Sequence, residues 1–155
     1  KQFWHQTVYC AHTFQKHCPH PILFHIYDDG SLDQIPDIKK QIPNARIIYS
    51  EEIAQNLKKN LPIDRYPYLH KKRQVYKHIR KLTDVYTDTY QGWKLVLDSD
   101  MLFWREPRQM IRWLLNPTNP FYILDCETAY GYPFAAMAEL AQTPIKERIN
   151  VGVLG

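Results

Sequence analysis

The chain has 155 residues, of which 45% are apolar and 14% aromatic, and its formal net charge is +4. These values exclude a disordered chain and predict one globular domain over residues 1–155, while the small positive charge favours phosphorylated ligands without indicating nucleic acid. No stretch approaches the roughly 18 consecutive apolar residues of a membrane helix and the first residues do not resemble a signal peptide, so we expect a protein without a transmembrane segment.

Apolar periodicity and turn residues predict alternating helices and strands. Helices are expected at residues 7–17, 35–41, 51–59, 68–86 and 135–140 and after Pro107, and strands at residues 22–27, 45–49, 94–97, 121–124 and 150–154. Ser50 is expected to cap the helix over 51–59. The alternation predicts an α/β fold with a largely parallel sheet covered by helices on both faces.

The longest predicted helix, over residues 68–86, is amphipathic. Its polar face includes Arg80, which can pair with Asp84 one turn later. Its apolar face is expected to lie on the sheet and consists of Tyr68, Val75, Ile79, Leu82 and Tyr86.

Acidic residues follow three of the predicted strands. They are Asp28 and Asp29 after 22–27, Asp98 and Asp100 after 94–97, and Asp125 after 121–124. Ligands of parallel α/β sheets bind beyond the carboxyl ends of the strands. Carboxylates gathered there would repel one another without a counter-charge, so the pattern indicates a site for a divalent cation, a sugar or both.

Asp98 and Asp100 flank Ser99. Residues two apart in an extended segment point to the same side, so both carboxylates can share one Mg²⁺ or Mn²⁺ while Ser99 faces away. Two carboxylates fill only part of an octahedral shell, which leaves positions for diphosphate oxygens. A capping or turn role is the alternative, because aspartate is common in both places.

Four segments occur in an order that resembles the GT-A-fold glycosyltransferases that use nucleoside-diphosphate sugars, especially the glycogenin-like and bacterial lipopolysaccharide-type members. The segments are YDDGSL (27–32), HIRKLTDVY (78–86), WKLVLDSDMLFWREP (93–107) and NVGVLG (150–155). The resemblance implies a Rossmann-like, mostly parallel sheet flanked by helices. It also implies metal-dependent transfer of a sugar from a nucleoside-diphosphate donor, with a UDP-sugar as the preferred class, to a glycan, protein or lipid-linked acceptor.

The resemblance further implies that these residues are part of a longer protein and lack segments at both ends. A full-length precursor mass close to 18.5 kDa would contradict that expectation.

The resemblance assigns a metal and diphosphate site. Asp98 and Asp100 match the family's DxD motif, which binds Mn²⁺ or Mg²⁺ and the donor diphosphate, and Ser99 lies between them. Lys81 matches a lysine that approaches the diphosphate or the donor sugar, and Arg80 beside it can act in the same way.

The remaining assignments concern the nucleoside and the sugars. Asp28 and Asp29 match positions that contact the base or ribose, and Asp125 and Asn150 match positions that contact the donor sugar or the acceptor. No residue is assigned as catalytic base or nucleophile, and the resemblance leaves the choice between retention and inversion open.

Two other functions fit the same residues. In a haloacid-dehalogenase-like phosphatase, Asp98 would attack phosphate and Asp100 would protonate the leaving group. Leu102 opposes this interpretation because Thr or Val is expected there, and the motif lies deep in the chain. The other alternative is a non-catalytic domain that binds a sugar nucleotide or a partner.

Cys10, Cys18 and Cys126 have no regular spacing, which predicts free thiols and a cytoplasmic protein, peripheral at a membrane if its acceptor is lipid-linked. The stretch CAHTFQKHCPH (10–20) lacks paired zinc-ligand spacing, so packed or solvated side chains are expected in place of a zinc site. The basic segment 70–81 is expected to be a solvated helix face and not a nucleic-acid patch.

Overall fold

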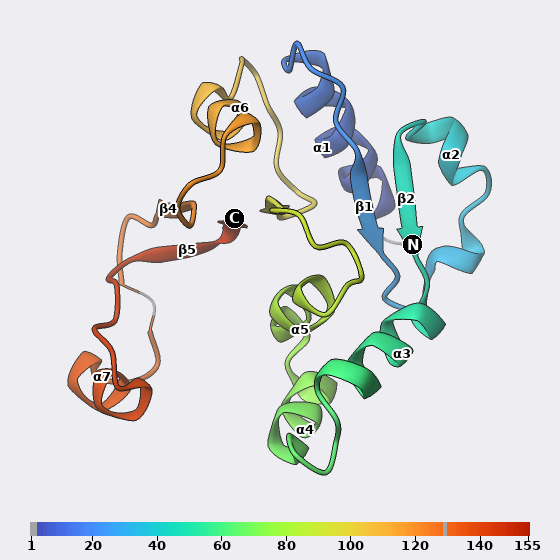
Figure 1. Ribbon diagram of the computed structural model, residues 1–155. Helices are drawn as coiled ribbons and strands as arrows, with labels where there is room; N and C mark the ends of the chain where they lie inside the picture. The colour runs from blue at the N-terminus through green and yellow to red at the C-terminus, as the bar shows by residue number, and fades with distance from the viewer. Residues whose placement is uncertain (1–2, 129) are drawn as a thin grey trace. The chain divides into compact units, whose positions relative to one another are not determined.

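Figure 1 shows the computed structural model, which describes residues 3–128 and 130–155. Helices and strands are mixed along the chain, which is compatible with the predicted α/β class. The helices are α1 (Trp4–Lys16), η1 (Leu32–Gln34), α2 (Ile38–Gln41), α3 (Ser50–Asn60), α4 (Pro67–Val75), η2 (Lys77–Ile79), α5 (Arg80–Tyr86), α6 (Arg108–Leu115) and α7 (Phe134–Ala141). The strands are β1 (Phe24–Tyr27), β2 (Ala45–Ile48), β3 (Val96–Leu97), β4 (Tyr122–Leu124) and β5 (Ile149–Leu154).

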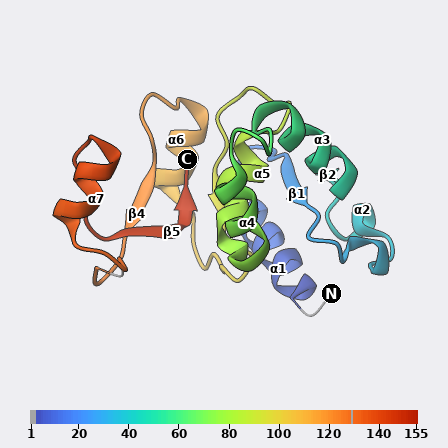
Figure 2. The same cartoon turned by 90° about the horizontal axis from the view of Figure 1, so that it is seen from below.

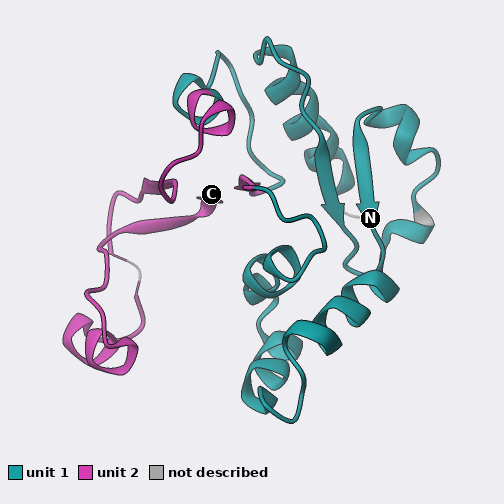
Figure 3. Ribbon diagram, in the orientation of Figure 1, with its two compact units in different colours: residues 1–92, 99–111 teal, residues 93–98, 112–155 magenta. Residues whose placement is uncertain are grey.

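The chain divides into two compact units, which Figure 3 draws in different colours. Unit 1 comprises residues 1–92 and 99–111, and unit 2 comprises residues 93–98 and 112–155. The boundaries therefore fall between Gly92 and Trp93, between Asp98 and Ser99, and within α6, between Ile111 and Arg112. The single domain expected over residues 1–155 stays a prediction.

Unit 1 is built on the parallel pair β1 and β2, whose two faces are both covered. Ala45 of β2 packs in a buried cluster with Trp4 and Ala11 of α1. Three residues later, on the other face of the strand, Ile48 is fully buried against Ile53 and Leu57 of α3. The two strands accordingly lie between α1 and α3 (Figure 2).

The segment over residues 99–107 is held against α1 within unit 1. Phe14 is 1% exposed and meets Phe103 edge to face, with ring centroids 4.9 Å apart. The backbone N–H of Phe103 donates to Thr13 Oγ1 at 3.2 Å. An aromatic pair and a hydrogen bond thus anchor a stretch that has no secondary structure of its own.

The predicted helix over residues 68–86 is interrupted. Tyr76 has φ −125° and ψ 92°, and the chain continues through η2 into α5. Arg73 of α4 donates two hydrogen bonds to Asp84 of α5, at 2.9 and 2.8 Å. In a straight helix residues eleven apart would be separated by about 16 Å along the axis, so this pair requires the break.

Two expectations for that segment are therefore wrong. Asp84 pairs with Arg73 and not with Arg80. The predicted apolar face does not lie on a sheet, because Tyr68 is 86% exposed and Val75 77%, and Leu82 and Tyr86 are also exposed.

Unit 2 contains a second sheet, in which β5 is the central strand between β3 and β4. Both pairings are antiparallel, so the described strands do not form the largely parallel sheet that was expected. Helices between strands favoured parallel neighbours, but β4 and β5 run in opposite directions although α7 lies between them in the chain. The apolar pattern of a strand does not encode its direction relative to its neighbours.

Three aromatic side chains contact one another in unit 2. Trp113 lies edge to face with Trp93 and also contacts Phe121, with centroid separations of 5.6 and 5.8 Å. Val153 of β5 is fully buried. Gly155 exchanges two backbone hydrogen bonds with Phe121, which extends the β4 and β5 pairing beside these rings.

The described residues were also compared with two expectations, on membrane-spanning helices and on disulfides. None of the helices in residues 3–128 and 130–155 combines the length and the apolar character needed to cross a membrane. In the same ranges no disulfide joins Cys10, Cys18 or Cys126.

Candidate functional site

The sheet of unit 2 groups three residues that the sequence singled out. Asp98 follows β3, Asp125 follows β4, and Asn150 lies in the central strand β5. The backbone N–H of Asp98 donates to the carbonyl of Gly152 at 2.8 Å, and that of Asp125 donates to the carbonyl of Arg148 at 2.6 Å. We name Asp98, Asp125, Asn150 and Gly152 the strand-end cluster.

Asn150 joins two parts of this cluster through its side chain. Its Nδ2 donates to Asp125 Oδ2 at 3.2 Å, and its Oδ1 accepts from the backbone N–H of Gly152 at 2.8 Å. The other Asp125 oxygen accepts from the backbone N–H of Cys126 at 2.8 Å. Because the amide must present an acceptor to Gly152 and a donor to Asp125, the network fixes the orientation of both side chains.

Gly152 is the point at which Asp98 and Asn150 converge. A Cβ at this buried position would lie 2.8 Å from Asn150 Oδ1 and 2.9 Å from Asp98 Oδ2. Real Cβ atoms essentially never come that close to an oxygen, so any other residue would displace one or both side chains. Glycine thus permits a carboxylate and an amide oxygen to occupy the same small region beside β5.

The chemistry of this cluster is that of hard oxygen donors, which magnesium and manganese prefer. Within residues 3–128 and 130–155 no three His, Cys, Asp or Glu side chains are grouped as metal ligands. The strand-end cluster instead offers two carboxylates and one amide. Ser99 and Asp100 are exposed and belong to unit 1, whereas Asp98 belongs to unit 2.

The two predicted diphosphate ligands lie in α5 of unit 1. Arg80 and Lys81 are both half-buried. The Nε of Arg80 is buried and has no hydrogen-bond partner among the described residues. A buried donor without an acceptor is unfavourable, and more so when it belongs to a charged group.

Asp28 and Asp29 stabilise the turn after β1. Asp28 Oδ1 accepts hydrogen bonds from the backbone N–H groups of Gly30, Ser31 and Leu32. Asp29 Oδ1 accepts from both the N–H and the hydroxyl of Ser31. These internal bonds give both carboxylates a structural role, and their contact with a base or ribose stays a prediction.

Asp28 also joins this turn to α3. Ser50 donates its hydroxyl to Asp28 Oδ2 at 2.7 Å and makes no side-chain cap, contrary to expectation. Burial alone would raise the pKa of Asp28, but the bonds from Ser50 and from the backbone of Gly30, Leu32 and Ser31 outweigh it and hold the pKa below its ordinary value.

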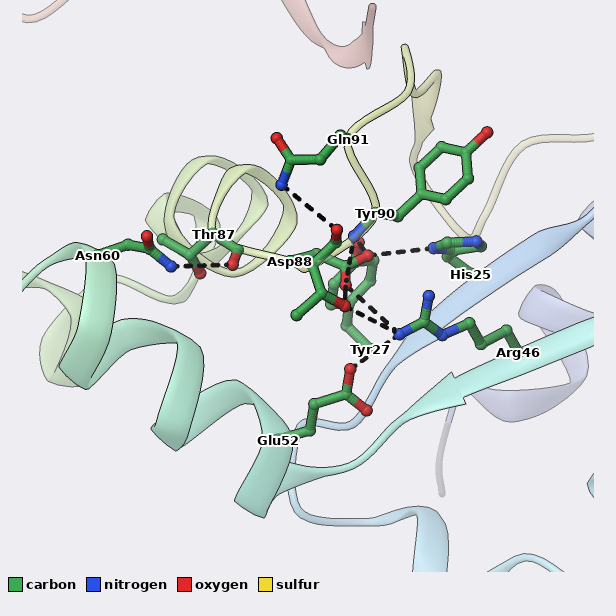
Figure 4. Close-up of polar contacts among 10 residues, drawn as sticks. His25, Tyr27, Arg46, Glu52, Asn60, Thr87, Asp88, Tyr90 and Gln91 are labelled. Carbon is green, nitrogen blue, oxygen red and sulfur yellow. Dashed lines mark hydrogen bonds and ion pairs between the residues drawn. The ribbon is translucent and has the colours of Figure 1, made fainter.

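The most buried carboxylate of unit 1 is one that sequence reasoning missed. The side chain of Asp88, just after α5, is fully buried, and Figure 4 shows its polar contacts. Its Oδ2 accepts from the Tyr27 hydroxyl at 3.0 Å and lies 3.3 Å from His25 Nδ1. Its Oδ1 lies 3.7 Å from Arg46 Nη2, which also donates to Glu52 at 2.9 Å. We name Asp88, His25, Tyr27 and Arg46 the Asp88 network.

The Asp88 network changes the acidity of Tyr27. Burial, together with the charge of Asp88 and the hydrogen bond to it, raises the pKa of the Tyr27 hydroxyl well above its ordinary value of 10.0. The phenol therefore remains a neutral donor, which is what a buried carboxylate requires. One signal was available in the sequence: His25 and Tyr27 are two residues apart in a predicted strand, so their polar side chains point to the same face.

Comparison with protein-family models, with curated proteins and with solved structures finds no match to this chain. The candidate sites are therefore interpreted from their own residues.

Replacing Tyr27 with Phe should lower the free energy of unfolding by about 2 kcal/mol, the typical contribution of a hydrogen bond to a charged group. The reason is that Asp88 would remain buried with one donor fewer. Urea unfolding followed by circular dichroism measures the change. Tyr49→Phe is the matched control, because Tyr49 is 47% exposed. Equal effects of the two substitutions would contradict the role of the Tyr27 hydroxyl.

Asp28→Asn should destabilise the chain at neutral pH by about 1 kcal/mol or more. Because the folded-state pKa is lowered, the stabilisation by Asp28 is present above its unfolded pKa, near 3.8, and is lost as pH falls through the folded value. Urea unfolding over a pH series should therefore show the two proteins converging below about pH 3.8. The exposed Asp33, replaced by Asn, is the control. A difference between wild type and Asp28→Asn that persists unchanged into strong acid would refute this account.

Proposed function

We propose that this protein is a metal-dependent glycosyltransferase that moves a sugar from a nucleoside-diphosphate donor, a UDP-sugar by preference, to a glycan, protein or lipid-linked acceptor. We also propose that its α/β units belong to a GT-A-type fold. The observation that carries the proposal is the strand-end cluster. Asp98, Asp125 and Asn150 come from three separate segments that the resemblance assigned to the donor or acceptor site. Asn150 donates to Asp125, and oxygens of Asn150 and Asp98 converge on Gly152.

Asp98 and Asn150 of the cluster offer oxygen ligands of the kind that a divalent cation takes. The space that a Cβ of Gly152 would fill is bordered by oxygens of Asp98 and Asn150, which are hard donors. In the proposal Asp98 and Asp100 hold Mn²⁺ or Mg²⁺. When bound, the cation supplies Lewis acidity that neutralises charge on the departing nucleoside diphosphate.

Other residues of the protein would contact the sugar and the diphosphate of the donor. Asn150 holds the Asp125 carboxylate in one orientation, which suits it to accept a hydrogen bond from a sugar hydroxyl. Arg80 and Lys81 would provide cationic donors to the diphosphate. The buried, unpartnered Nε of Arg80 supports this role, because an anionic ligand would satisfy it. Asp28 and Asp29, with Ser99, complete the proposed donor contacts.

Asp98→Asn should weaken Mn²⁺-dependent UDP binding by at least about tenfold, since even residues that only orient metal ligands have effects of that size. Asp100→Asn should do the same. Calorimetric titration of UDP with and without Mn²⁺ measures the effect, and Asp64→Asn, at an exposed position between α3 and α4, is the matched control. UDP affinity that is identical with and without Mn²⁺, or equal in all variants, would overturn the proposal.

The reaction product separates this function from the two alternatives. Incubation with a UDP-sugar and an acceptor should yield a glycoside and UDP. Release of inorganic phosphate from a phosphomonoester, abolished by Asp98→Asn, would instead identify a phosphatase. Metal-dependent binding of the sugar nucleotide without any turnover in the full-length protein would identify a binding domain.

Gly152→Ala should reduce Mn²⁺-dependent UDP binding while changing the melting temperature little. The new Cβ would push Asp98 and Asn150 away from the positions they now share, whereas alanine itself is acceptable in a strand. Calorimetry and thermal unfolding of the same samples measure both quantities. Gly131→Ala is the control, because a Cβ there would meet nothing within 4 Å. Full retention of metal-linked binding in Gly152→Ala would show that this convergence of oxygens is not part of the site.

A further inference from the structure

One face of α4 combines cations with apolar side chains and is open to solvent. Tyr68, Lys71, Lys72 and Val75 are spaced three or four residues apart, so they share a face. All four are exposed, with Tyr68 at 86% and Val75 at 77%. The opposite face carries Arg73, whose two hydrogen bonds to Asp84 link α4 to α5.

The outer face continues past the end of α4. Tyr76 is 48% exposed, and the Lys72 ammonium lies 5.3 Å from the centre of its ring. Lys77 follows and is exposed. We name this surface the basic aromatic patch, and it consists of Tyr68, Lys71, Lys72, Val75, Tyr76 and Lys77.

The charge of this region is of one sign. Residues 67–83 contain no aspartate or glutamate. The first acidic side chain after them, Asp84, is buried and already bound to Arg73. The lysines of the patch therefore have no carboxylate within their own segment, and the complementary surface is anionic.

We propose that the basic aromatic patch docks on an anionic lipid surface. The lysines would lie among anionic headgroups, while Tyr68, Tyr76 and Val75 enter the boundary between headgroups and acyl chains. A nucleic acid could use the lysines and stack on the tyrosines, but it offers nothing to an aliphatic side chain that is 77% exposed. Val75 is thus the residue that favours lipid over nucleic acid.

Docking of this kind is reversible and depends on charge. Each lysine near an anionic membrane strengthens association roughly fivefold, and salt weakens that contribution. Salt does not screen the apolar part. We therefore expect the membrane affinity to have two separable contributions. One depends on the charge of the lysines, and the other depends on the apolar surface of Tyr68 and Val75. This proposal is independent of the transfer activity proposed above.

The test is co-sedimentation of the whole chain with vesicles of phosphatidylcholine alone or mixed with phosphatidylserine. We expect binding only when phosphatidylserine is present. The double variant Lys71→Gln and Lys72→Gln should lower the partition coefficient roughly 25-fold, at about fivefold for each lysine. The control is Lys58→Gln with Lys59→Gln, which removes the same charge from exposed positions of α3 and should leave binding nearly unchanged.

A third variant, Tyr68→Ser with Val75→Ser, tests the apolar component without altering charge. It should weaken vesicle binding several-fold, and its urea unfolding should match that of wild type, because both side chains are exposed. Absence of binding to phosphatidylserine vesicles, or equal losses in the α3 control, would overturn the proposal. So would tight binding to single-stranded RNA that the lysine variant abolishes and the Tyr68 and Val75 variant leaves intact, since that pattern identifies a nucleic-acid surface.

Discussion

The buried carboxylate of Asp88 is the constraint on which the arrangement of unit 1 depends. A charged group removed from water is tolerated only where donors surround it. Here they come from Tyr27 and Arg46 on two strands and from Thr89 and Tyr90 in the loop itself. His25 and Arg46 are register partners in the parallel pair, so their side chains emerge on the same face of the sheet. A slip of one residue between β1 and β2 would turn Arg46 to the opposite face and leave Asp88 with fewer partners. The network therefore fixes both the strand register and the position of the loop that follows α5.

In unit 2 the polar side chains are held in place in a different way. Its polar groups are less buried, and their positions follow from the backbone pairing of β5 with a strand on either side. The Asn150 side chain donates a hydrogen bond to Asp125 and accepts one from the backbone N–H of Gly152, two residues further along β5. These bonds fix the orientation of the Asn150 and Asp125 side chains. The two units thus illustrate different ways to hold carboxylates: Asp88 is surrounded by donors and closed to solvent, whereas Asp98 and Asp125 stay half-exposed at the ends of strands, where a ligand can reach them.

Local sequence signals were sufficient to predict most helices and strands, but not the contacts that their side chains make with distant residues. The apolar run at Ala45–Ile48 and the acidic and basic ends of Ser50–Asn60 predicted β2 and α3 within two residues. The bond from Ser50 to Asp28 and the pairing of Arg73 with Asp84 could not be predicted, because each links side chains that only the tertiary structure brings together. Asp88 was missed for the same reason: its partners Tyr27 and His25 are 61 and 63 residues away, and an aspartate after a helix looks like an ordinary end residue. Asp98 and Asp125 of the strand-end cluster were found because strand ends can be located locally, whereas Asn150 was assigned through the family resemblance and Gly152 was not singled out. The antiparallel pairing that brings these residues together could not be predicted.

The glycine at position 152 also affects how this chain can evolve. Glycine inside a strand lowers stability by roughly 0.5 to 1 kcal/mol relative to alanine, so selection for folding alone would favour its replacement. Every other amino acid carries a Cβ, however, and a Cβ here would meet two side-chain oxygens below 3 Å. Because both oxygens end side chains that can move, a substitution here would shift Asp98 and Asn150 without preventing folding. A lineage that relaxed the demand on these two side chains would be expected to lose this glycine early, at a gain in stability.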